Sequence, residues 1–172
     1  MATHQRSQSR RKRSRNAGTE TQRIAGQMRR AWKGQAWHGP SLSEVLRGID
    51  ARAAAARPLP GAHSIWELAL HIASWDVVIR RRLAGEVFAV TKQEDWPAVS
   101  EPATAAQWRK TVRALDAAHA KLIAAARRFP QDRLHDRVRG KKYSFYVMLH
   151  GIVQHDLYHA GQIALLKRAL VP

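Results

Sequence analysis

Residues 149–167 read LHGIVQHDLYHAGQIALLK, and this stretch decides the fold that we expect. His155 and His159 are four residues apart, so on a helix they differ by roughly 40° around the axis and share one face. Four apolar residues in and beside the segment fall near the same direction: Met148, Ile152, Leu166 and Leu170. The pattern predicts a helix over residues 144–170 that directs two histidines at a hydrophobic core.

Three further helices are predicted upstream, over residues 41–56, 64–84 and 104–129. Each begins at a Ser or Thr with Glu or Gln three residues later, which is the pattern of a capping box; the pairs are Ser41 with Glu44, Ser64 with Glu67 and Thr104 with Gln107. No segment alternates apolar and polar residues as a strand does. The sequence therefore predicts an all-α four-helix bundle over residues 31–172.

The chain is strongly basic, with a net charge of +17 over 172 residues. Residues 1–33 hold ten Lys or Arg and one acid, so +9 of this charge lies at the N-terminus. The polar composition without periodicity predicts a disordered basic tail over residues 1–30. Such a tail could bind nucleic acid. We do not expect it to, because no aromatic residue lies among its charges to stack on bases.

Several classes of protein are excluded by what the sequence lacks. It contains no Cys, so disulfides, thiolate metal sites and a Cys nucleophile are ruled out. No apolar run approaches the roughly 20 residues of a membrane span. The charged N-terminus has no apolar core like that of a signal peptide. We therefore expect a cytoplasmic protein with no membrane partner.

Two histidines facing a core need partners, because an unpaired buried polar group costs about 1–3 kcal/mol. A metal ion would satisfy both; the alternative is a pair of core histidines bonded to backbone or carboxylates. His71 lies at the edge of the apolar stripe of residues 64–84 and could supply a third ligand. Three His ligands and an open position are typical of catalytic zinc sites. At imidazole ligands, zinc or nickel is favoured over manganese.

Residues 155–159, HDLYH, also resemble the metalloprotease pattern H-E-x-x-H, with Asp156 at the position of the Glu. That family takes its third ligand from downstream, where residues 160–172 contain no His, Asp or Glu, so we do not expect a protease. Asp76 and Asp156 could accept the distal N–H of a metal-bound imidazole, or be exposed carboxylates paired with Arg. Gln162 lies roughly 20° from His155 around the helix and could reach the same site.

Three segments carry a resemblance to a known family: AWHGPSLSEVL (36–46), HSIWELALHIASWD (63–76) and LHGIVQHDLYHAGQIALLK (149–167). Over about residues 37–167 the chain resembles the DinB/YfiT-like superfamily of metal-dependent four-helix proteins. The resemblance implies a metal site made by His71, His155 and His159. It also implies that a homodimer can form, for which the apolar face of the third helix offers a surface.

The same resemblance leaves the activity open. Some such proteins are S-transferases or isomerases that use a low-molecular-weight thiol, others are metal-dependent hydrolases, and many have no known reaction. The first hypothesis is a metal-dependent enzyme that activates a thiol or water for S-transfer onto a small electrophile. The alternatives are a hydrolase and a non-enzymatic, metal-stabilised binding protein, so whether the chain is an enzyme stays open.

Overall fold

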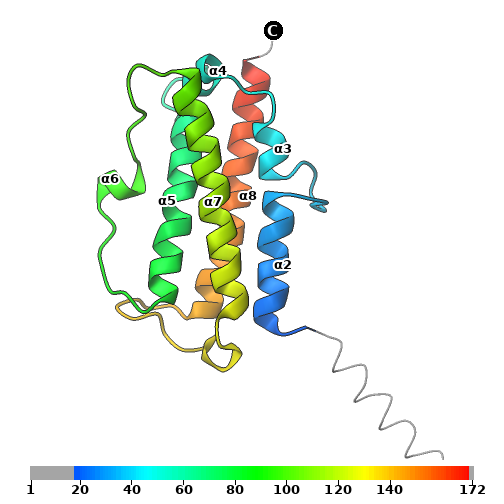
Figure 1. Ribbon diagram of the computed structural model, residues 1–172, viewed down its shortest axis with the longest axis vertical. Coiled ribbons are helices and arrows are strands. Elements are labelled where there is room, and N and C mark those ends of the chain that lie inside the picture. Colours follow the sequence, from blue (N-terminus) through cyan, green and yellow to red (C-terminus); the bar gives the residue numbers. More distant parts are fainter. Residues whose placement is uncertain (1–17, 171–172) are drawn as a thin grey trace, which may run out of the picture.

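Four long helices, each begun by a Ser or Thr cap, make up most of the computed structural model, which describes residues 18–170. They are α2 (Glu20–Trp32), α5 (Ile65–Leu83), α7 (Ala105–Arg128) and α8 (Phe145–Ala169). They lie side by side (Figure 1), and no strand occurs in the described residues. The all-α four-helix bundle is therefore confirmed. Three of its helices match the predicted ranges to within one residue at each end.

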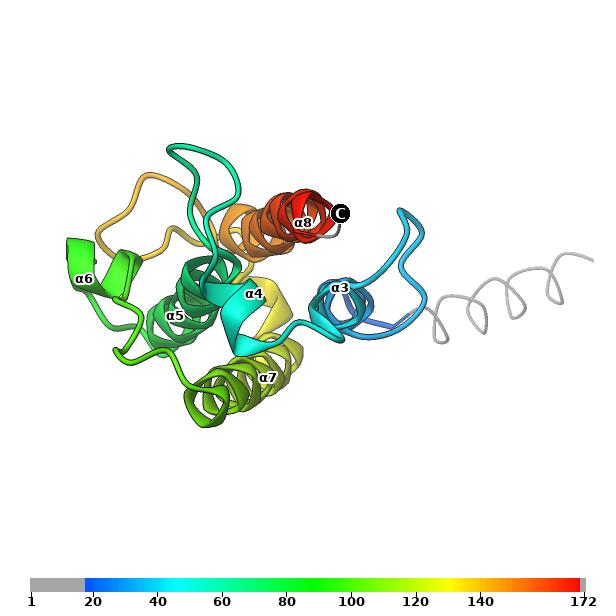
Figure 2. The ribbon, with the colours of Figure 1, turned by 90° about the horizontal axis from the view of Figure 1, so that it is seen from above.

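The order of the helices around the bundle is α5, α7, α2 and α8, each packing against the next and α8 closing on α5. α5 and α7 run in the same direction, opposite to α2 and α8 (Figure 1). This parallel pair requires the crossover, residues 84–104, to return along the length of the bundle. The crossover contains a short helix, α6 (Lys92–Asp95), which lies outside α5 in both views (Figures 1 and 2).

The predicted first helix, residues 41–56, is wrong as a single element. It is divided into α3 (Leu42–Leu46) and α4 (Ala51–Ala55). Gly48 separates them with φ +78°, a left-handed conformation that glycine adopts at little steric cost and that commonly ends a helix. The Asp50 side chain then caps α4. α3 lies above the end of α2, at the same corner of the bundle (Figures 1 and 2).

The predicted disordered tail, residues 1–30, is wrong from residue 20 onward, and residues 1–17 lie outside the described part of the chain. α2 takes the fourth place in the bundle instead. Thr19 and Gln22 form its capping box, and its buried apolar residues follow helical spacing: Ile24, Ala25, Met28, Ala31 and Trp32. Its arginines face solvent, so the same residues that suggested a tail form the exposed side of an amphipathic helix.

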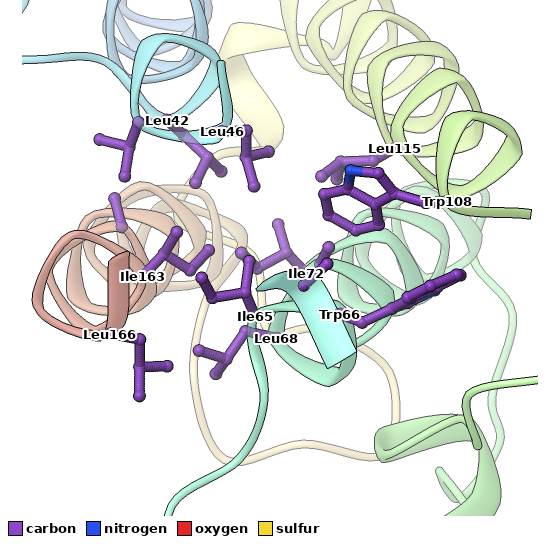
Figure 3. Close-up of a cluster of buried hydrophobic side chains, with 14 of the residues drawn as sticks. Leu42, Leu46, Ile65, Trp66, Leu68, Ile72, Trp108, Leu115, Ile163 and Leu166 are labelled. Carbon is purple, nitrogen blue, oxygen red and sulfur yellow. The ribbon is translucent and has the colours of Figure 1, made fainter. Parts of the chain in front are cut away.

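The core has two apolar parts with a polar layer between them. Figure 3 shows the part at the α3–α4 end, where side chains of α3, α5, α7 and α8 meet. The other part lies towards the opposite end, where α2, α5, α7 and α8 meet the loop that precedes α8. Between them along α5, α7 and α8 lie Asp76, His119 and Asp156, all buried, which we call the polar layer. The apolar face of α7, predicted as a candidate dimer surface, is buried within the bundle itself.

Each helix within residues 18–170 is too short or too polar to span a lipid bilayer.

Candidate metal centre

The three histidines predicted as metal ligands meet between α5 and α8. One ring nitrogen from each of His71, His155 and His159 lies within 4.8 Å of the other two. The Nε2 atoms of His71 and His155 are 3.0 Å apart. Two nitrogens bound to one tetrahedral zinc ion would be roughly 3.3 Å apart, so the spacing fits. His71 and His159 are buried and His155 is partly exposed, which leaves an approach from one side.

The other ring nitrogen of each histidine faces an oxygen acceptor. Nδ1 of His71 lies 2.6 Å from the backbone oxygen of Asp95, and Nδ1 of His159 lies 2.6 Å from Oε1 of Gln162. Nδ1 of His155 lies 3.3 Å from Oδ1 of Asp156. An acceptor at Nδ1 keeps the proton there and leaves the Nε2 lone pair free. All three rings are thus oriented as metal ligands are, and the donor set fits a divalent ion.

Burial keeps the three imidazoles neutral. Removal from water lowers the pKa of His71 and of His155 below the ordinary 6.5. The same cause lowers the pKa of His159 to about 4. Metal ions bind neutral imidazole, and protons compete for the same lone pair. The site is therefore in its binding form at neutral pH.

The polar layer contacts the candidate metal site through Asp156, whose carboxylate lies beside His155. His119 connects the two buried carboxylates: its Nδ1 is 3.1 Å from Oδ2 of Asp76 and 3.7 Å from Oδ2 of Asp156. Its Nε2 donates to the backbone oxygen of Met28 in α2 at 3.3 Å. Burial raises the pKa of Asp76 to about 6 and that of Asp156 to about 7. Burial by itself would lower the pKa of His119. The hydrogen bond to Asp76 and the negative charge of Asp76 outweigh burial, so the pKa of His119 is raised.

The three residues predicted to support the ligands have different outcomes. Asp156 contacts His155, as an acceptor for the imidazole N–H would, and Gln162, which was predicted only to reach the site, contacts His159. Asp76 contacts His119 and none of the three expected ligands directly. The alternative of exposed carboxylates paired with Arg is wrong for both Asp76 and Asp156, since each is buried.

The crossover supplies two further site residues, Trp96 and Asp95, whose contacts with the histidines were not predicted from the sequence. Trp96 stacks on His71, with ring centroids 3.9 Å apart, and also on His63 at 3.6 Å. Asp95 accepts from Trp75 Nε1 at 2.7 Å through its side chain, while its backbone oxygen faces His71. No spacing rule could find these contacts, because they depend on the path of the crossover across α5.

A cavity of about 270 Å³ opens beside His155, between α5 and α8. Its walls are mostly apolar and aromatic, formed by residues including Trp75, Ile79 and Ile152. Small-molecule sites range from roughly 300 to 1,000 Å³, so this cavity would hold only a small ligand. The candidate metal ligand His155 thus lies at the edge of a space that could contain a reactant.

Comparison with known protein families matches residues 36–163 to the DinB superfamily. Neither the comparison with curated proteins nor that with solved structures finds a match. The matched segment covers well over half of the chain and includes all three histidines. The chain belongs to the DinB superfamily.

Proposed function

We propose that this chain is a metal-dependent enzyme that transfers a low-molecular-weight thiol onto a small electrophile. His71, His155 and His159 would bind one divalent ion, with zinc or nickel favoured at an all-imidazole site. The observation that carries the proposal is the shared orientation of the three rings, with every Nδ1 facing an oxygen acceptor. Buried histidines that serve only packing also bond to backbone or carboxylate oxygens, but they need not bring three second nitrogens to within 4.8 Å of one another, as these do.

A divalent ion in such a site lowers the pKa of a bound thiol or water and so supplies a nucleophile near neutral pH. The protein's own residues perform the rest. Asp95, Asp156 and Gln162 hold the rings in place through their acceptor oxygens. The apolar walls of the cavity, including Trp75 and Ile152, exclude water from the space beside His155.

The composition of the cavity favours a thiol over water as the nucleophile. Hydrolysis by an activated water commonly uses a general base within hydrogen-bond reach. No carboxylate is among the residues lining the cavity, and His155 already belongs to the metal site. A thiol depends less on such a base than water does, because its ordinary pKa is about 8.5 against 15.7 for water, so it loses its proton at a metal more readily. The lining therefore supports S-transfer and gives less support to the hydrolase alternative.

The first test is metal content. The untagged chain, purified without chelators and reconstituted with zinc or nickel, should hold about one ion, by elemental analysis. We expect His71→Ala and His155→Ala to lose it, whereas His38→Ala, which removes an exposed histidine, should keep it. A chain that stays metal-free, or metal that survives both site substitutions, would refute the three-histidine site.

The second test is the reaction. The loaded chain is given cysteine as test thiol and 1-chloro-2,4-dinitrobenzene as test electrophile, so that an S–C bond forms as chloride leaves. We expect a rate above the uncatalysed one that disappears in His71→Ala. Metal binding without any thiol-dependent turnover, across a panel of thiols and electrophiles, would leave the site intact and reject the transferase.

A further inference from the structure

The cavity beside His155 contains a buried positive charge. Arg82, near the end of α5, lines the cavity and is only 5% exposed. Its Nη1 donates to the hydroxyl of Tyr143 at 2.9 Å, while its Nε is buried and has no hydrogen-bond partner. No carboxylate in residues 18–170 is close enough to form an ion pair with it. A guanidinium stays charged in proteins, so this charge cannot be removed by loss of a proton.

Arg81, the preceding residue, has the acidic partners that Arg82 lacks. Arg81 bonds to Glu86 at 2.7 Å, approaches Glu94 at 3.6 Å and lies over the ring of Phe88 at 3.7 Å. Arg82 is 5.6 Å from the Trp75 ring, near the outer limit of a cation–π contact. The acids of the crossover thus neutralise the half-buried Arg81 and leave the fully buried Arg82 unpaired. A buried, unpaired charge is costly unless a partner arrives.

The rest of the cavity is suited to an apolar group. Trp75, Ile79, Met148 and Ile152 form its walls. Gly151 also lines it, and a Cβ built there would meet no other atom within 4 Å, so the missing side chain adds open space. The space therefore offers apolar walls and a single cationic group.

We propose that Arg82 and Tyr143 form an anion-binding subsite, and that the cavity takes a small organic carboxylate whose apolar body lies against Trp75 and Ile152. A carboxylate can accept from two guanidinium nitrogens at once, and the Tyr143 hydroxyl holds the guanidinium in place. This rests on the proposed function only in assigning the bound carboxylate to the reaction. The binding itself needs no metal.

The test is calorimetric binding of phenylacetate and its neutral analogue phenylacetamide to the full chain, metal-free and zinc-loaded. We expect the chain to prefer phenylacetate by at least about tenfold, because a hydrogen bond to a charged group contributes that much. Arg82→Gln should lose this preference. Arg80→Gln, which removes an exposed charge from the same helix, should keep it.

Two further variants keep the test decisive if Arg82→Gln fails to fold. Tyr143→Phe retains the charge and should weaken phenylacetate binding by about three- to tenfold, the effect of one hydrogen bond. Gly151→Leu should fill the cavity and weaken both ligands equally. Equal binding of the two ligands by the wild-type chain, or a preference that survives Arg82→Gln, would overturn the subsite. Equal losses in Arg80→Gln would reduce it to general electrostatic attraction and overturn it too.

A third ligand separates the two sources of such a carboxylate, the electrophile and the thiol. If 3-mercaptopropionate gains affinity on zinc loading and loses it in Arg82→Gln, the thiol carries the carboxylate. If phenylacetate alone depends on Arg82, the electrophile carries it. Both outcomes support the subsite. Preference for phenylacetate that persists in metal-free His71→Ala would keep the subsite even if the proposed transferase were rejected.

Discussion

Replacing Gln162 by Leu should weaken metal binding without disturbing the fold. Oε1 of Gln162 lies 2.6 Å from Nδ1 of His159, and this bond raises the pKa of His159 against the effect of burial. Losing it makes the imidazole a poorer base and frees the ring to rotate. Partners of this kind are worth about 10- to 100-fold in metal affinity. We therefore expect a loss of roughly 1.4–2.7 kcal/mol in binding free energy.

Competition with a chromophoric zinc chelator measures this change. Gln162→Glu keeps an acceptor oxygen and should restore affinity, while Gln154→Leu makes the same exchange at an exposed site on α8 and should have no effect. Thermal unfolding of the metal-free proteins checks that all three variants remain folded. Unchanged zinc affinity in Gln162→Leu, or an equal loss in Gln154→Leu, would refute the assignment of His159 as an Nε2 ligand oriented through its Nδ1.

Three further expectations follow from the packing and the pKa shifts. Met28→Ala should cost about 2–5 kcal/mol of unfolding free energy in chemical denaturation, because the side chain is 1% exposed; a cost no larger than that of the exposed Arg29→Ala would contradict the place of α2 in the core. Metal affinity should begin to fall only below pH 6.5, because burial lowers the pKa of all three ligands, to about 4 for His159. By the same sign, the three histidines should lower the stability of the metal-free fold as pH falls from 6.5 towards 4, while Asp76 and Asp156, whose pKa values burial raises to about 6 and about 7, act in the opposite direction. Metal release that starts above pH 6.5 in a chelator titration would disagree. Trp96→Ala should raise the pKa of His71 towards 6.5 in an NMR titration of the metal-free chain, because the stacked ring shields it from water; an unmoved titration would show that Trp96 contributes nothing to that shielding.

Helical periodicity was sufficient to predict α5, α7 and α8, because each has a long apolar stripe and a capping signal. It failed at α2 because the segment follows a strongly basic stretch and contains three arginines of its own, while its five buried apolar residues are mostly small or isolated. It failed again at residues 41–56, where one glycine outweighed a run of good helix formers. In α2 the spacing of the apolar residues, and in residues 41–56 a single glycine, decided the local structure, whereas the average composition of each segment pointed to a different one.

The candidate site divides along the same line. Ligands on regular helices could be predicted, since the spacing of His155 and His159 fixes their common face. The supporting residues could be predicted only where they are one or three residues from a ligand, as Asp156 and Gln162 are. The contact of Asp95 with His71 and the buried place of Arg82 beside the cavity could not, because they depend on the path of the crossover and on the depth of the cavity. Both are set by tertiary packing.

The polar layer also determines the axial position of each helix relative to its neighbours. A slide of α8 by one turn, about 5.4 Å, would carry Asp156 away from His119 and leave a buried carboxylate among aliphatic side chains. The apolar parts above and below contain Leu and Ile that could repack after such a slip. The contacts among Asp76, His119 and Asp156 therefore fix the register of the helices. This register keeps His71 of α5 level with His155 of α8.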